Sequence, residues 1–149
     1  MRFEFRQFPI LGDRSTIAAR AAECAAQQDL FWEFHDTLFS EWGVDAFGSA
    51  NNRRIAAEIG VDTNIFNKCL DQARVQKYVD SDYELGRTME VGSTPFVFIN
   101  GRPVNGLAEL AVYEQMIEEE LNNVAHTVID GSGSTAGGCF ASESEIECE

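Results

Sequence analysis

Hydrophobic and polar residues alternate at the start of the chain and then change to a helical spacing. Polar and apolar residues alternate over residues 2–8, with Phe3, Phe5 and, less regularly, Phe8 on matching faces, which predicts a β-strand. Pro9 and Gly12 end this strand pattern. From there to about residue 90 the apolar side chains recur every three or four positions, so this region is expected to be helical.

The helical region divides into several expected helices. Asp13 or Ser15 caps the first, which is rich in alanine and is therefore expected to pack closely against its neighbours. Gly60 ends one helix, and Asp62 or Thr63 caps the next. The expected ranges are 15–28, 30–39, 51–59, 63–70 and 73–90, the last weakened locally by Gly86.

The spacing changes again after residue 90. Residues 96–99 form a short apolar run typical of a buried strand, and Asn100-Gly101 is a strong hairpin signal. Residues 102–105 are the expected returning strand, which Pro103 places at a sheet edge. An amphipathic pattern over residues 108–121 predicts a final helix.

The composition predicts one domain followed by a tail. Residues 1–121 carry the regular patterns, whereas residues 122–149 hold a Gly/Ser-rich linker, GSGSTAGG, and an acidic segment with cysteines. The expected domain consists of the strand, a helical insert over residues 13–90, the hairpin over residues 96–105 and the helix over residues 108–121.

Charge and hydropathy limit the classes of partner. The net charge of -14 argues against nucleic acid and anionic membranes, because both would be repelled. No apolar run approaches the roughly 20 residues that span a bilayer, and no signal peptide is visible in this chain. His35 and His126 show no metal-ligand spacing to the cysteines, so neither a metal nor another cofactor is expected.

The four cysteines contain no C-x-x-C pair. Cys24 and Cys69 lie within helix patterns, and two interpretations are about equally favoured: small buried hydrophobic residues, or a structural disulfide between two helices. Cys139 and Cys148 lie among carboxylates, which raise a thiol pKa, so a local tail disulfide is preferred over a redox pair. No catalytic cysteine is therefore assigned.

Four stretches together resemble one known family. These are FRQFPILG, AARAAECAAQQDLFWEFHDTLF, FNKCLDQARV and VGSTPFVFINGRPVNG, and with their surroundings they cover about residues 2–121. They resemble the DsbA-like branch of the thioredoxin-fold disulfide oxidoreductases. The resemblance implies an α/β, thioredoxin-like fold with a helical insertion. It also implies a strand and a C-x-x-C helix upstream of residue 2, so an N-terminally truncated domain is expected.

The resemblance also implies a substrate-binding loop at Ser93, Thr94 and Pro95. Base rates alone favour a trans peptide before Pro95, but S-T-P-F before the hairpin matches the family's cis-proline loop. A cis bond would point the Thr94 backbone outward, where its N–H and C=O could pair with an extended substrate.

The expected function is thiol–disulfide exchange on protein or peptide thiols, with a membrane redox protein as a further partner and a periplasmic or other extracytoplasmic location. Two alternatives stay open. One is a non-catalytic peptide-binding module, and the other is an isomerase or glutathione-dependent enzyme on the same fold. Oxidase, reductase and isomerase differ mainly in redox poise, so the direction of exchange is not predicted.

Overall fold

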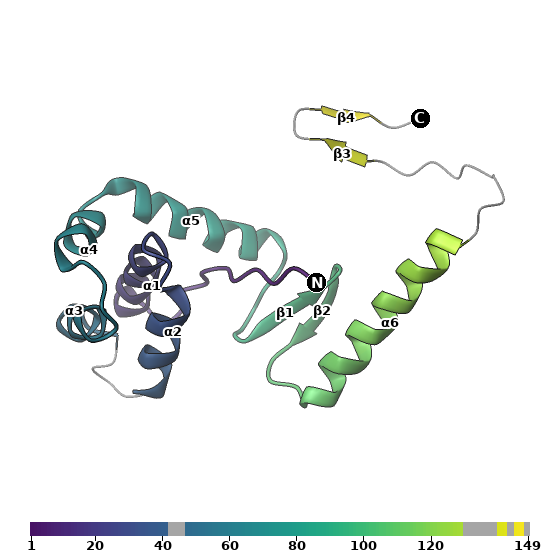
Figure 1. Cartoon of the computed structure of the whole chain (residues 1–149), viewed down its shortest axis with the longest axis horizontal. Coiled ribbons are helices and arrows are strands. Elements are labelled where there is room, and N and C mark those ends of the chain that lie inside the picture. The colour runs from purple at the N-terminus through teal and green to yellow at the C-terminus, as the bar shows by residue number, and fades with distance from the viewer. Residues whose placement is uncertain (42–46, 130–139, 143–144, 148–149) are drawn as a thin grey trace. The chain divides into compact units, whose positions relative to one another are not determined.

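The computed structural model describes residues 1–41, 47–129, 140–142 and 145–147. Its helices and strands are labelled in Figure 1. Contacts divide the chain into two compact units, Met1–Thr94 and Pro95–Glu149. The division falls inside the range 1–121 that the sequence suggests as one domain. In the described residues, no helix is long and apolar enough to cross a membrane.

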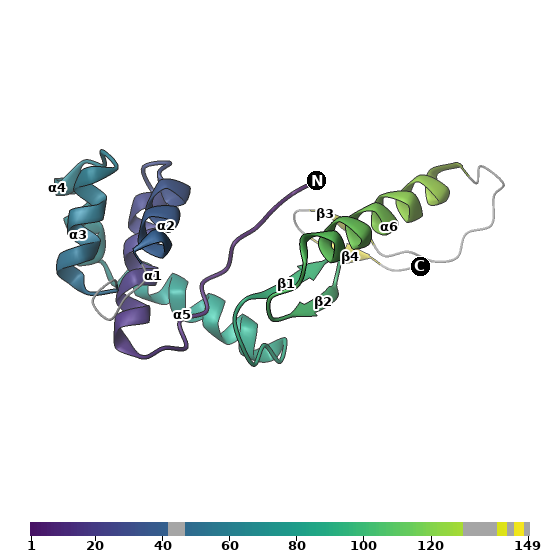
Figure 2. The same cartoon turned by 90° about the horizontal axis from the view of Figure 1, so that it is seen from below.

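The first unit is helical. Its helices are α1 (Asp13–Ala26), α2 (Phe31–Ser40), α3 (Ser49–Glu58), α4 (Thr63–Leu70) and α5 (Ala73–Thr88). All five lie within about two residues of the ranges expected from the apolar spacing. Helix α1 contacts each of the other four helices of this unit, and Figure 2 shows the helices around it from a second side.

Alanines on α1 form the centre of the core. Ala21 and Ala25 are fully buried, and Ala18 and Ala22 are nearly so. Small side chains allow neighbouring helices to approach closely, which is how one helix contacts four others. The larger core residues come from those neighbours: Phe34 from α2, Ile55 from α3, Phe66 from α4 and Val75 from α5.

Three of these helices end in the same way, with one residue in the left-handed region. These residues are Asp29 after α1, Gly60 after α3 and Glu90 after α5, with φ of 60°, 90° and 58°. In each case the next backbone N–H donates to a carbonyl five residues earlier, at 2.9–3.2 Å. This arrangement satisfies carbonyls that the helix leaves unpaired. Gly60 was predicted for this role, and the other two positions were not.

The expected strand over residues 2–8 is wrong. Residues 1–10 have no regular secondary structure, and Figure 1 shows this segment as a coil leading to α1. A strand requires a hydrogen-bonded neighbour, and in the described residues nothing pairs with this segment. Side chains hold it instead: the Gln7 backbone N–H donates to Asp82 of α5 at 2.9 Å, and the Gln7 amide donates to Glu23 of α1 at 2.9 Å.

Phe8 also anchors this segment. Its ring stacks on Tyr83 of α5 with centroids 5.2 Å apart. It lies directly over Gly86, where an added Cβ would come within 2.7 Å of the Phe8 ring. Gly86, which weakens the helical pattern in the sequence, therefore makes space for an aromatic side chain on α5.

The second unit begins with a hairpin. Strand β1 (Phe96–Ile99) pairs antiparallel with β2 (Arg102–Asn105), with Phe96 opposite Asn105 and Ile99 opposite Arg102. Asn100 and Gly101 connect them with positive φ at both positions, as the predicted Asn-Gly turn requires. Both strands have the bounds expected from the sequence.

Helix α6 (Leu110–Ile129) follows the hairpin and extends well beyond the expected end at residue 121. Arg102 connects the hairpin to this helix, since its guanidinium lies 2.9 Å from Glu119 and 3.2 Å from Glu120. Farther along, β3 (Phe140–Ser142) pairs with β4 (Glu145–Glu147). The sequence patterns did not predict these two short strands.

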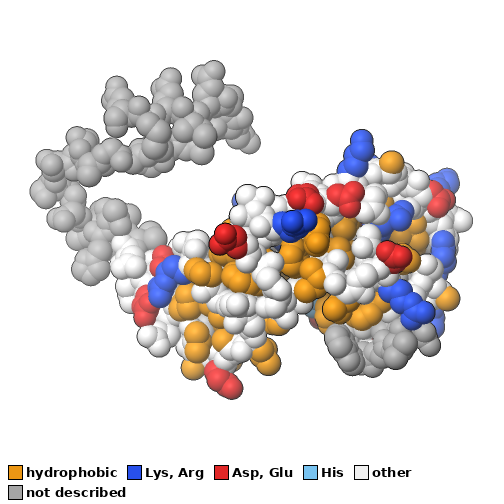
Figure 3. Space-filling view, turned by 180° about the vertical axis from the view of Figure 1, so that it is seen from behind, with side chains coloured by type: hydrophobic (Ala, Val, Ile, Leu, Met, Phe, Trp, Pro, Cys, Tyr) orange, Lys and Arg blue, Asp and Glu red, His pale blue; other side chains and the backbone are white. Residues whose placement is uncertain are grey.

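The two units differ in how far they bury their side chains. The first unit has a buried core, whereas none of residues 95–123 is buried. Strand β1 is half-buried along its whole length, and Leu107, Leu110 and Leu121 are exposed. Figure 3 shows apolar side chains on the visible surface of each unit.

Candidate functional site

The candidate peptide-binding loop lies immediately before β1. Thr94 is the last residue of the first unit, and Pro95 is the first of the second. The Gly106 backbone N–H donates to the Pro95 carbonyl at 2.9 Å, which extends the β1–β2 pairing by one step. Pro95 is therefore held at the base of the hairpin through its carbonyl.

The Thr94 backbone is available to a partner. Thr94 and Pro95 are exposed, and Ser93 is half-buried. Within the described residues, neither the Thr94 N–H nor its carbonyl forms a hydrogen bond. Backbone groups are strong donors and acceptors, so an exposed unpaired N–H and C=O beside a strand are suited to strand addition.

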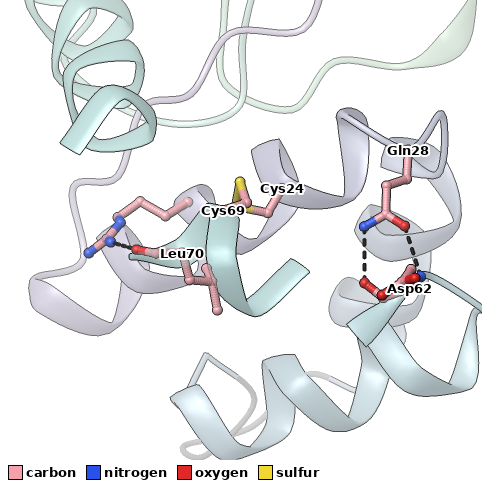
Figure 4. Close-up of a disulfide and its surroundings, with 6 residues drawn as sticks. Cys24, Gln28, Asp62, Cys69 and Leu70 are labelled. Carbon is pink, nitrogen blue, oxygen red and sulfur yellow. Dashed lines mark hydrogen bonds between the residues drawn. A yellow bond between two sulfur atoms is a disulfide. The ribbon is translucent and has the colours of Figure 1, made fainter. Parts of the chain in front are cut away.

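Cys24 and Cys69 form a disulfide between α1 and α4, which Figure 4 shows in its surroundings. Their Cα atoms are 5.7 Å apart, and both residues are fully or almost fully buried. The sequence left two interpretations open, buried free thiols or a disulfide between two helices, and the structure contains the disulfide. It connects residues separated by 45 positions, which suits a structural role.

Neither of these cysteines lies where a reactive thiol is expected. A helix N-terminus lowers a thiol pKa, but Cys24 and Cys69 are close to the C-terminal ends of α1 and α4. Burial also keeps a substrate away from both sulfurs. Cys139 and Cys148, expected to pair in the tail, lie outside the described residues.

Polar contacts hold the region around the disulfide. The Arg20 side chain donates to the Leu70 carbonyl at the end of α4. Gln28 and Asp62 form two reciprocal hydrogen bonds, which are dashed in Figure 4. The Asp62 carboxylate also accepts from the backbone N–H groups of Asn64 and Ile65, so it is the predicted N-cap of α4.

A buried carboxylate, Asp82, and a half-buried one, Glu23, lie where the N-terminal segment meets α5 and α1. Asp82 is almost fully buried and accepts from the Gln7 N–H and from Arg6, the latter at 3.0 Å. Burial raises the pKa of Glu23, and the Gln7 amide partly opposes this effect. Burial likewise raises the pKa of Tyr78, assisted by the charges of Glu23 and Asp82.

The remaining titratable side chains that the structure describes do not cluster as metal ligands would. The described residues contain no group of three or more His, Cys, Asp or Glu side chains that could hold a metal ion. His35 is packed among aromatic rings, 4.6 Å from Phe39 and 5.3 Å from Phe5 between centroids, and its Nδ1 lies 2.9 Å from Asp36.

A protein-family model described as thioredoxin matches residues 1–119. The chain belongs to this thioredoxin family. Its mixture of helices with a small antiparallel sheet is a thioredoxin-like fold, and the resemblance inferred from the four sequence stretches is confirmed.

Two solved structures place the chain in the DsbA-like branch of this family. One is the thiol-disulfide exchange protein alpha-DsbA2 from Wolbachia pipientis, 28% identical with a TM-score of 0.71, where the match covers 78% of this chain and 63% of that one. The other is a thioredoxin-like oxidoreductase from Silicibacter pomeroyi DSS-3, 25% identical with a TM-score of 0.65, covering 78% and 66%.

Curated relatives of two kinds also match. Na(+)/H(+) antiporter NhaA 3 of Salinispora tropica is 32% identical over 108 residues, which are 71% of this chain and 16% of that protein. Disulfide bond formation protein D of Bacillus subtilis is 25% identical over 130 residues, which are 81% and 57%. The chain thus spans a small part of the antiporters and just over half of the disulfide-forming relative.

The peptide-binding loop stays a prediction from the sequence, whereas the polar contacts that hold the N-terminal segment were not predicted. Because residues 2–8 were predicted to form a strand, their backbone groups were expected to pair with another strand. Hydrogen bonds from Gln7 to α1 and α5 were therefore not predicted. Asp82 falls on the buried side of α5, at a spacing of three from Val79. An acidic residue in such an apolar stripe is the signal that could have indicated a buried partner.

Proposed function

We propose that this chain takes part in thiol–disulfide exchange on protein thiols outside the cytoplasm, as the part that holds the substrate chain. The observation that carries the proposal is the exposed Thr94 backbone, unpaired among the described residues and followed directly by β1. The likeness to a thiol-disulfide exchange protein and to a disulfide bond formation protein supports the reaction class.

In the proposed mode, a substrate segment lies extended along the loop and pairs with the Thr94 N–H and C=O. Backbone pairing holds many sequences equally well, which suits an activity on diverse protein thiols. The Thr94–Pro95 peptide is cis in this proposal, as the family resemblance implies. NMR carbon shifts of the Pro95 ring measure this directly, and a trans peptide would contradict it.

The redox step requires a reactive cysteine pair, and this sequence contains no C-x-x-C. We propose that a C-x-x-C pair of a protein partner, or of another part of the same protein, reacts beside the loop. In the reducing direction, one thiolate of the pair attacks the substrate disulfide, whose S–S bond breaks, and the released thiolate takes a proton. The second cysteine then displaces the substrate, so the pair becomes a disulfide and the substrate a dithiol. The same steps in reverse oxidise two substrate thiols and reduce the pair. A membrane redox protein that reoxidises or reduces the pair is the further partner.

Peptide binding by the chain tests the proposal. A fluorescently labelled, extended peptide with one cysteine is titrated and followed by anisotropy. Pro95→Ala should weaken binding about thirtyfold, since two hydrogen bonds of about 1 kcal/mol each would be misplaced. Pro103→Ala, in the same hairpin, is the matched control and should bind like the parent. Equal affinities for both variants would refute the loop as the peptide site.

Catalysis is tested separately by reduction of insulin. The chain alone should not accelerate the reaction above the reductant background, because its described cysteines are buried in a disulfide. Clear turnover would show that the assignment of the cysteines is wrong.

A second candidate function is favoured by the antiporter match. In this case the chain is a non-catalytic, thioredoxin-like module associated with a membrane transporter. The two candidates differ in one measurement. Added C-x-x-C protein should react faster with the labelled peptide in the presence of this chain only if the chain presents the substrate for exchange.

A further inference from the structure

A cavity of about 280 Å³ lies between α1, α3 and the end of α4, away from the Thr94–Pro95 loop in sequence and within the first unit. Its charged and polar lining comes from Arg20 of α1, from Ser49, Asn52 and Arg53 of α3, and from Asp71 after α4. Ile17 and Leu70 supply apolar lining. Leu70 directly follows Cys69 of the disulfide, and Figure 4 shows the two residues side by side.

Two buried polar atoms of this lining have no hydrogen-bond partner in the described part of the chain. They are the Arg20 Nε, a donor, and the Asn52 Oδ1, an acceptor. Arg20 uses another nitrogen for the Leu70 carbonyl, and Asn52 uses its amide nitrogen for the Phe47 carbonyl at 3.4 Å. Asn52 is only 2% exposed. Buried polar groups are nearly always hydrogen-bonded. An unpaired donor and an unpaired acceptor in the same lining therefore indicate a polar ligand.

The charges of the lining residues indicate whether the ligand is anionic, cationic or both. Arg20 and Arg53 favour an anionic group, and the Arg53 Nε donates to Asn67 at 2.9 Å, which fixes the direction of its side chain. Asp71 disfavours a simple anion and favours a cationic group. The Asn52 oxygen also requires a donor. A molecule carrying both a carboxylate and an ammonium group satisfies all of these residues.

We propose that this cavity binds a small zwitterion of the α-amino acid class with an aliphatic side chain. The carboxylate is bound by Arg20 and Arg53, the ammonium group by Asn52 and Asp71, and the aliphatic part lies against Ile17 and Leu70. The Arg20 Nε and Asn52 Oδ1 atoms are covered in this structure, so this binding mode requires both side chains to turn toward the ligand. The volume of about 280 Å³ is many times the roughly 10–15 Å³ that one water needs, and a ligand of this class is small enough to enter it.

NMR titration of the full chain with L-leucine tests this site. The Arg20 Nε–H and Asn52 side-chain N–H signals should shift and saturate. 4-Methylpentanoate lacks the ammonium group and isopentylamine lacks the carboxylate, so each should bind at least about tenfold more weakly, as expected for one lost charged hydrogen bond. Equal binding of 4-methylpentanoate would overturn the zwitterion assignment, and saturation by sodium acetate alone would show adventitious anion binding only.

A conservative variant tests the role of Arg20. Arg20→Lys keeps the charge and removes the Nε donor, so leucine affinity should fall about tenfold. Arg14→Lys, on the same helix and outside the cavity lining, should leave it unchanged. The proposal is overturned if leucine shifts neither side chain in the parent chain, a result that does not depend on any variant folding.

Discussion

Removal of the Cys24–Cys69 disulfide should destabilise the helical unit strongly. The bond joins residues 45 positions apart. Closing a loop of that length removes chain entropy from the unfolded state equivalent to about 4 kcal/mol at room temperature. Cys24→Ala with Cys69→Ala should therefore lower the free energy of unfolding by about 3–4 kcal/mol. The melting temperature should fall by roughly 10 °C or more.

Urea unfolding followed by far-ultraviolet circular dichroism measures this change. Both proteins should carry Cys139→Ser and Cys148→Ser, so that the tail cysteines cannot exchange with the core pair. The double alanine variant should also show a larger dependence on urea, because its unfolded chain is no longer cross-linked and exposes more surface. A variant within about 1 kcal/mol of its parent would refute the reasoning from loop closure. So would two free thiols in the denatured parent without reductant.

Three further substitutions test other parts of the fold by urea unfolding. Burial raises the pKa of Glu23. Above pH about 4.3, the ordinary value, the unfolded chain loses the Glu23 proton while the folded protein still holds it. The free energy of unfolding therefore falls as pH rises from about 4.3 to the folded pKa. Glu23→Gln should therefore be the more stable protein at neutral pH, with the difference vanishing in acid; a pH-independent difference would contradict this. Gly86→Ala should destabilise, because its Cβ would meet the Phe8 ring. In a Phe8→Ala background the same change should stabilise by up to about 1 kcal/mol through helix propensity, and the same sign in both backgrounds would argue against the contact. Glu90→Gly should stabilise by about 0.5–1 kcal/mol, since φ is 58° there; Glu84→Gly, inside α5, is the control and should destabilise.

Local signals explain why most of the fold could be predicted from the sequence. Asp62 caps α4 through two hydrogen bonds, and Asn100-Gly101 adopts the positive φ values that its hairpin turn requires. Both outcomes depend on neighbouring residues alone. The candidate loop stays a prediction, which rests on a local signal of the same kind: S-T-P-F directly precedes the hairpin.

The errors occur where contacts distant in the sequence decide the outcome. Residues 2–8 alternate like a strand, yet a strand depends on a partner that the alternation does not identify. Gln7 instead pairs with Asp82 and Glu23, respectively 75 and 16 positions away. The space that Gly86 leaves for Phe8, and the left-handed backbone at Asp29 and Glu90, also depend on packing that no single stretch of sequence encodes.

Peptide binding at the proposed loop should be linked to the stability of the second unit. None of residues 95–123 is buried, and β1 is hydrogen-bonded to β2 on one side only among the described strands. A ligand that binds the folded hairpin alone stabilises it by about 2.7 kcal/mol at a concentration 100 times its Kd. Hydrogen exchange of the amides in β1 should therefore slow by up to about 100-fold with saturating peptide. The buried helices around the disulfide have their own core, so their exchange should change little. Slowing confined to those helices would place the peptide elsewhere, and slowing confined to β1 and its pairing partner would support strand addition beside Thr94.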